Sequence, residues 1–139
     1  MAVMRTVEIA GANRIGHGID IPHERDAAGL LRHMAAKGLP VEVNLTSNEF
    51  ILGVKGADHP LPLYRRFGVP FVISTDDAGV SRSTLSQEYL LYVTRYRPSY
   101  AELKATVYRS IRHAFLAPEV QARELKKLDQ AFATFEQKI

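Results

Sequence analysis

Three short stretches rich in β-branched and aromatic residues alternate with helical patterns, and this alternation restricts the fold more than any other feature of the chain. The strand-like stretches lie within 13–19, 39–48 and 69–77, and the helical patterns between them cover 23–38 and 59–68. Strand, helix, strand, helix, strand is the order of parallel strands joined by helical crossovers. We therefore predict an α/β fold with a parallel sheet.

After residue 77 the sequence indicates only helices. Thr84 with Gln87, and Ser99 with Glu102, have the spacing of a capping box, in which each side chain accepts a hydrogen bond from the other residue's backbone N–H. Pro118 suits the first turn of a last helix. Two heptads are too few for a coiled coil, so we expect the apolar residues of that helix to be buried against the rest of the domain: Leu125, Leu128, Phe132 and Phe135.

The composition excludes several classes of function. The chain of 139 residues has no cysteine, so it has no thiolate zinc ligand and no cysteine nucleophile, and any metal must be held by His, Asp or Glu. Its 18 Lys and Arg are spread among 15 acidic residues rather than clustered, which argues against a nucleic-acid partner. No apolar stretch of 18 residues is present, so we expect no membrane partner. We expect a cytoplasmic protein, with any signal peptide lying upstream of Met1.

Polar side chains follow each predicted strand. His17 ends the first strand, the stretch Asn44 to Asn48 ends the second, and Asp76 with Asp77 ends the third. Functional groups of parallel α/β sheets collect at these carboxyl ends. Two adjacent carboxylates repel each other by about 1 to 4 kcal/mol, so a divalent metal is the simplest compensating group. Because neighbouring strand residues point to opposite faces, one Asp could reach the metal while the other contacts a ligand.

Each of these residues also has an ordinary structural interpretation. An Asp at the start of a helix is often only a cap. The flanking residues Gly16 and Gly18 suggest that backbone or ligand approaches His17 closely. We expect the remaining histidines to pack within helices or to begin them, without a chemical role: His23, His33, His59 and His113.

Three motifs together carry a resemblance to a known family. "RIGHGID", "VEVNLTSNEFILGV" and "HPLPLYRRFGVPFVISTDDAGVSRSTLSQEYLL", in this order and spacing, resemble the C-terminal half of the adenosine deaminase family of metal-dependent hydrolases. The resemblance runs from about Val7 to Tyr92. It implies strands six, seven and eight of a (β/α)8 barrel, a zinc cofactor, and hydrolysis of the 6-amino group of a purine nucleoside with release of ammonia.

The resemblance also implies a role for individual residues. His17 matches the histidine that hydrogen-bonds and orients the metal-bound water, Asp76 matches a zinc ligand, and Asp77 matches the aspartate that hydrogen-bonds the purine ring. Ser47 and Asn48 match a motif at the mouth of the same site. The absence of cysteine excludes the other class of zinc deaminases, which carries an H-x-E…P-C-x-x-C signature.

Two departures limit what the resemblance implies. Ala78 stands where the family usually has a proline, and the chain has neither the His-x-His nor the His-Ala-Gly-Glu motif of the family. A catalytic zinc site needs about three protein ligands and a (β/α)8 barrel about 250 residues. We therefore expect a half-barrel, with strands and helices in 1–80 and a helical tail in 81–139, that lacks a full zinc site and is inactive alone.

Three explanations are open for such a half-barrel. The chain belongs to a longer deaminase, or it is a non-catalytic remnant that serves as a binding or assembly module. Otherwise it is an unrelated phosphoryl-transfer domain whose paired aspartates hold magnesium, although that class places its acidic pair near the first strand. The expected partners are a purine nucleoside and either the missing N-terminal half or further copies of the chain, joined through open strand edges.

Overall fold

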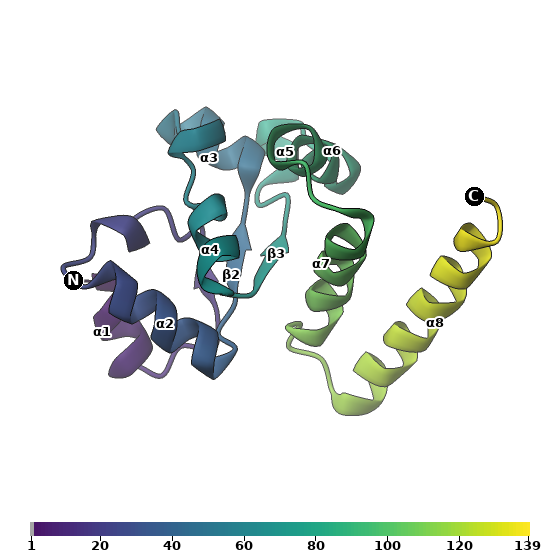
Figure 1. The fold of residues 1–139 in the computed structure, drawn as a ribbon, viewed down its shortest axis with the longest axis horizontal. Coiled ribbons are helices and arrows are strands. Elements are labelled where there is room, and N and C mark those ends of the chain that lie inside the picture. Colours follow the sequence, from purple (N-terminus) through teal and green to yellow (C-terminus); the bar gives the residue numbers. More distant parts are fainter. Residues whose placement is uncertain (1) are drawn as a thin grey trace.

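The computed structural model describes residues 2–139 and contains a three-stranded parallel sheet. The strands are β1 (Ile15–Gly16), β2 (Val41–Val43) and β3 (Phe71–Ile73), in the order β1-β2-β3. Val41 in the central strand pairs with Ile15 on one side and Phe71 on the other. The crossover helices α2 (Ala27–Lys37) and α4 (Leu61–Phe67) join consecutive strands (Figure 1). The predicted parallel α/β order is confirmed.

The strands end earlier than the sequence predicts. The stretch 39–48 was expected to be a strand, but β2 ends at Val43 and the helix α3 (Leu45–Leu52) begins after Asn44. The last of the three strands likewise ends at Ile73, so both aspartates lie in the turn beyond it. The reason is that the chain turns away directly after each short strand, at Asn44 before α3 and at Asp76 after β3. The pattern of apolar residues does not indicate these turns.

The remaining elements flank this sheet. α2 begins at Ala27 rather than at residue 23, because the Asp26 carboxylate accepts the Gly29 N–H at 2.8 Å and so caps the helix there. The other elements are α1 (Ala2–Glu8), η1 (Ile21–His23), η2 (Gly56–Asp58), α5 (Ala78–Ser81), α6 (Leu85–Tyr96), α7 (Tyr100–Arg112) and α8 (Pro118–Glu136). Among residues 2–139, no helix is long and apolar enough to span a bilayer.

The core lies between the sheet and the helices α2, α4 and α6. The ring of Tyr92 on α6 packs edge-on against Phe71 of β3, with 5.7 Å between ring centroids. α2 contributes Leu30, Leu31 and Met34 to this core. The largest fully buried apolar side chains are Ile21, Leu30, Leu31, Met34, Leu45, Leu61, Tyr64, Phe71 and Tyr92. Among the three strands, β3 is buried at every position, β2 at its two ends, and β1 only at Ile15.

One of the two predicted capping boxes forms. Thr84 accepts the Gln87 N–H at 3.2 Å, and the Gln87 side chain accepts the Thr84 N–H at 2.8 Å. Ser99 accepts the Glu102 N–H at 3.2 Å, but the Glu102 carboxylate pairs with Arg65 instead, at 2.6 and 2.7 Å. The second reciprocal box was therefore a wrong prediction, because a tertiary ion pair takes the carboxylate.

The last helix departs most from expectation. α8 packs against α7 and stands apart from the sheet (Figure 1). None of its residues is buried, and Phe135 is 51% exposed, so the predicted burial of its apolar stripe is wrong. Leu128, Phe132 and Phe135 instead line an apolar groove of about 370 Å³ between α7 and α8. Phe132 also stacks on Tyr108, with 5.6 Å between the ring centroids.

Candidate functional site

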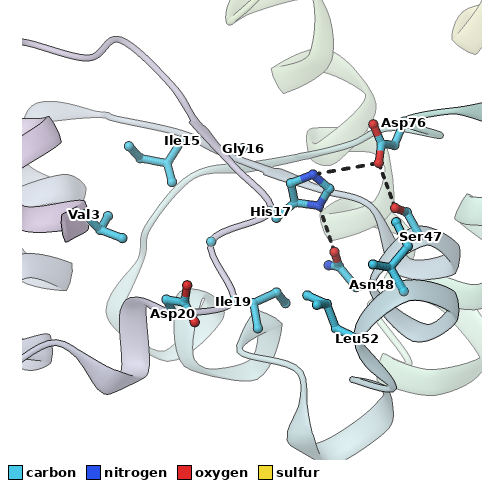
Figure 2. Close-up of a pocket in the computed structure, with 12 residues that line it drawn as sticks. Val3, Ile15, Gly16, His17, Ile19, Asp20, Ser47, Asn48, Leu52 and Asp76 are labelled. Carbon is cyan, nitrogen blue, oxygen red and sulfur yellow. Dashed lines mark hydrogen bonds and ion pairs between the residues drawn. The ribbon is translucent and has the colours of Figure 1, made fainter. Parts of the chain in front are cut away.

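A pocket of about 410 Å³ opens at the carboxyl ends of the strands. Its polar lining comes from three segments that are distant in the sequence: His17 and Asp20 after β1, Ser47 and Asn48 in α3, and Asp76 after β3 (Figure 2). Apolar side chains such as Ile15 complete the wall. The structure thus brings together four of the five side chains that the sequence singled out.

The turn after β1 aims His17 into this pocket. Its backbone N–H donates to the Glu42 carbonyl at 2.8 Å, and its φ is 59°. Gly18 follows with φ 69°, and a Cβ there would lie 2.7 Å from a Val41 methyl and still closer to the Tyr64 hydroxyl, which donates to the Gly18 carbonyl at 2.6 Å. The close approach at Gly18 is therefore made by side chains, and no comparable contact exists at Gly16, where a Cβ would meet nothing within 4 Å.

Asp76 occupies an equally unusual backbone conformation, with φ 54°. Its Oδ2 accepts a hydrogen bond from Ser47 Oγ at 2.7 Å and lies 3.8 Å from His17 Nε2 (Figure 2). Among residues 2–139, the other two non-glycine residues with positive φ are Arg82 and Arg97, which end helices. Positive φ at a non-glycine residue costs about 1 to 3 kcal/mol and is typical of functional sites.

Behind His17 lies a buried polar network. His17 Nδ1 is 2.9 Å from Asn48 Oδ1 and 3.2 Å from Asn44 Nδ2. The amide Nδ2 of Asn48 is in turn 2.9 Å from Nε2 of His59, and His59 Nδ1 accepts the Leu61 N–H at 3.1 Å. The last contact confirms that His59 helps to begin α4.

The position of His59 was not predicted from the sequence. Its side chain is 1% exposed, and burial together with the positive charge of Arg95 lowers the pKa of His59 to about 4. The imidazole is therefore neutral at pH 7. Its contact with Asn48 spans 11 residues through a turn, and no local spacing signals it.

The start of α3 is fixed from another helix. Glu88 of α6 is fully buried, and its Oε2 accepts the Thr46 N–H at 3.2 Å. A carboxylate is favourable at this end of a helix because of the exposed N–H groups there. Glu88 thereby positions the turn that carries Ser47 and Asn48, a role that the sequence did not signal.

Asp77 lies differently from its neighbour. Both aspartates are exposed, but Asp77 directly precedes α5, and its side chain makes no capping hydrogen bond there. Asp77 is not among the residues that line the pocket. Both aspartates follow the strand rather than belong to it, so their different directions come from the left-handed turn at Asp76 and not from strand alternation.

The side chains at the pocket fit one edge of a metal site. Asp76 offers a carboxylate and His17 an imidazole, which are ligand types suited to zinc. Within residues 2–139, however, no group of three or more His, Cys, Asp or Glu side chains is arranged to hold a metal ion. The ligands needed for a complete site are thus not gathered in this part of the chain.

Parallel strands joined by helices, with an imidazole and a carboxylate at their carboxyl ends, define an α/β domain of the class that binds its ligands at this end of the sheet. A model of the adenosine deaminase family matches residues 1–131. The chain belongs to the adenosine deaminase family. This finding confirms the resemblance and rules out the phosphoryl-transfer alternative.

Individual relatives agree with this assignment. The chain is 34% identical over 123 residues to an adenosine deaminase of Enterococcus faecalis, and 32% identical over 123 residues to an adenosine deaminase of Haemophilus ducreyi. Each match covers 88% of this chain. The chain spans only 36% and 35% of the length of these two relatives.

Solved structures show the same fold. The N6-methyl-AMP deaminase of Arabidopsis thaliana superposes with a TM-score of 0.74 at 28% identity, over 86% of this chain and 34% of that one. An adenine deaminase of Arthrobacter aurescens gives a TM-score of 0.79 at 23% identity over 94% of this chain and 39% of that one. A zinc-bound amidohydrolase of Burkholderia ambifaria gives a TM-score of 0.82 at 19% identity, over 98% of this chain and 38% of that one. The last two support the fold alone.

Proposed function

We propose that this chain contributes strands six to eight of a zinc-dependent deaminase that converts adenosine, or a related purine nucleoside, to its 6-oxo product and ammonia. The observation that carries the proposal is the meeting of His17 and Asp76 at 3.8 Å, in a pocket at the carboxyl ends of parallel strands, within a region matched by the family. The sequence relatives named adenosine deaminase support a nucleoside as substrate.

Each side chain has a distinct role in this proposal. Asp76 would hold the zinc ion, which when bound polarises a water molecule. The Ser47 hydroxyl fixes one oxygen of the Asp76 carboxylate, as outer partners of metal ligands commonly do. His17 directs its Nε2 towards the same space and orients the attacking water. Asp77, exposed beside the pocket, would hydrogen-bond the purine ring and so orient the substrate.

The proposed domain organisation follows from the sheet. Residues 1–80 contain the three strands and 81–139 form the helical tail. Within the described residues β1 and β3 each pair with β2 alone, which leaves one edge of each free. The segments that relatives have outside the matched region would cover these edges and supply the remaining metal ligands.

A second candidate is a non-catalytic module that binds or assembles with another protein. The observation that favours it is the lack of a three-ligand cluster within residues 2–139. On either reading we expect this 139-residue chain by itself to retain no stoichiometric zinc and to form no inosine.

The test compares two aspartate variants in the protein as its gene encodes it. Asp76→Ala should lose both bound zinc and inosine formation, because a metal ligand is removed. Asp77→Ala should keep zinc but lose rate, because the substrate is misoriented. Zinc is measured by elemental analysis after dialysis and activity by ammonia release. Full zinc and full rate in both variants would overturn the assignment, and an inactive unmodified protein would favour the binding module.

A further inference from the structure

The polar network behind His17 determines which ring nitrogens carry protons. A neutral imidazole has one N–H and one lone pair. His59 Nδ1 accepts the backbone N–H of Leu61 at 3.1 Å, and a backbone N–H can only donate. Nδ1 of His59 therefore carries the lone pair. Because burial beside Arg95 keeps this ring neutral, the proton lies on Nε2.

The proton on His59 Nε2 then orients the Asn48 amide. Nε2 lies 2.9 Å from that amide and needs an acceptor. The oxygen of Asn48 must accordingly face His59, and its NH₂ group must face His17, a half-turn from the orientation drawn in Figure 2. The two orientations fill the same space, and the hydrogen-bond partners decide between them.

The hydrogen-bond partners of the His17 ring assign its proton in the same way. After the half-turn, the Asn48 NH₂ group occupies the position 2.9 Å from His17 Nδ1 and donates to the lone pair of that nitrogen. The Asn44 amide lies 3.2 Å from the same nitrogen. We propose that His59, acting through Asn48, fixes the neutral His17 ring in the tautomer with its proton on Nε2. The nitrogen that faces Asp76 and the pocket is then a hydrogen-bond donor.

This tautomer limits the chemical roles that His17 can have in the reaction, a consequence that rests on the proposed function. With the proton on Nε2, the neutral ring donates a hydrogen bond to an oxygen in the pocket and stabilises negative charge that develops there. It offers no lone pair towards the pocket and cannot act there as a general base. His59 and Asn48 are positioning residues, since they act on the reaction through His17.

The experiment reads the tautomer directly. Long-range ¹H–¹⁵N correlation spectra of the histidine-labelled chain, recorded at mildly alkaline pH where imidazoles are generally neutral, distinguish a proton on Nδ1 from one on Nε2. The His17 signals are assigned by their loss in His17→Gln. We expect the Nε2–H pattern for His17 and for His59 in the unmodified chain.

Asn48→Asp changes the bridge and preserves its shape. The carboxylate still accepts the His59 proton but has no donor for His17, so the His17 proton should move to Nδ1. His23→Gln, at an exposed histidine on η1, is the matched control and should leave both patterns unchanged. In the protein as its gene encodes it, Asn48→Asp should lower kcat by about 10- to 100-fold with a smaller change in KM.

Either of two results in the unmodified chain overturns the proposal: an Nδ1–H pattern for His17, or rapid exchange between tautomers. A folded Asn48→Asp chain that keeps Nε2–H removes Asn48 from the mechanism. If that variant does not fold, the spectrum of the unmodified chain still shows which tautomer His17 adopts. Neither zinc nor substrate is present in these spectra, so failure of the proposed deaminase activity is distinguishable from failure of the tautomer assignment.

Discussion

At the scale of single residues, backbone conformation sets the geometry of the candidate site. His17 and Asp76 both adopt positive φ, and this turns their side chains towards each other from strands that are not adjacent in the sheet. The turn at His17 depends in addition on Gly18, against which Tyr64 packs without room for a Cβ. The two candidate side chains are therefore placed by local strain that the surrounding core sustains.

Two neighbouring glycines provide a matched test of this packing. Gly18→Ala should destabilise the protein by at least about 2 kcal/mol, because the new methyl group meets Val41 and Tyr64 at positive φ. Gly16→Ala places its methyl in open space and should change the free energy of unfolding by less than about 0.5 kcal/mol. Denaturant unfolding measures both. Equal effects would show that the close approach at Gly18 does not hold.

The buried His59 makes stability depend on pH. Its pKa is lowered to about 4 in the folded state, so below the ordinary value near 6.5 the unfolded chain binds more protons. The free energy of unfolding should therefore fall as the pH decreases from about 6.5 to 4, by up to about 1.4 kcal/mol per pH unit from this group. The contribution of His59 is the difference between the unmodified protein and His59→Gln in the slope of unfolding free energy against pH. Parallel pH profiles would contradict the prediction.

At the scale of elements, ion pairs join helices of the tail to the helices α3 and α4 beside the sheet. Arg65 on α4 binds the Glu102 carboxylate of α7 through two nitrogens and donates to the Tyr96 carbonyl at the end of α6 at 2.9 Å. A second pair joins Glu49 of α3 to Arg95 of α6. Arg65 thereby connects α4, α6 and α7. Near the pocket, the hydrogen bond from the Thr46 N–H to Glu88 also connects α3 to α6.

The bidentate pair between Arg65 and Glu102 should contribute more to the free energy of unfolding than an exposed surface pair does. Arg65→Lys keeps the charge but loses the fork of donors, and should cost about 1 to 2 kcal/mol because both side chains are largely covered. Lys127→Ala, which breaks an exposed pair with Glu124 within one turn of α8, should cost less than about 0.5 kcal/mol. Thermal unfolding compares the two. A larger loss for Lys127→Ala would refute the ranking.

How much of the structure was predictable varies with the range of the interaction. The α/β order follows from the apolar pattern of each segment, and the Thr84 capping box follows from contacts within one helical turn; both were predicted correctly. The ends of the strands, the left-handed turn at Asp76 and the contact of His59 with Asn48 depend on neighbours that are distant in the sequence. The apolar stripe of α8 specified an amphipathic helix but not the surface against which it packs.

At the scale of the whole molecule, each outer strand of the sheet has one edge without a strand partner among residues 2–139. β3 is nonetheless buried along its length and packs against α7, whereas Gly16 of β1 is exposed. Only β2 has a partner on each side within the described residues, and α7 and α8 extend away from the end of the molecule where α1 and α2 lie (Figure 1). Free strand edges expose unpaired backbone groups and favour association. The apolar groove between α7 and α8 adds a second surface without cover from the rest of the described chain.

We therefore expect the purified chain to associate in solution. Pairing of two copies through strand edges would be the simplest closed arrangement, since it satisfies backbone groups on both. Light scattering coupled to size-exclusion chromatography measures the mass. A sharp 15.5 kDa monomer with cooperative unfolding would contradict this expectation and would indicate that three strands and their helices form a complete domain.

The packing of α8 against α7 also has a dynamic consequence. A helix that buries none of its residues has few contacts to lose when it opens, so its backbone amides can exchange with solvent hydrogen while the sheet stays intact. Tyr108 and Phe132, stacked between the two helices, would separate in that opening. The pocket at His17 and Asp76 lies on other elements, so its geometry is insulated from these openings of the C-terminal helix.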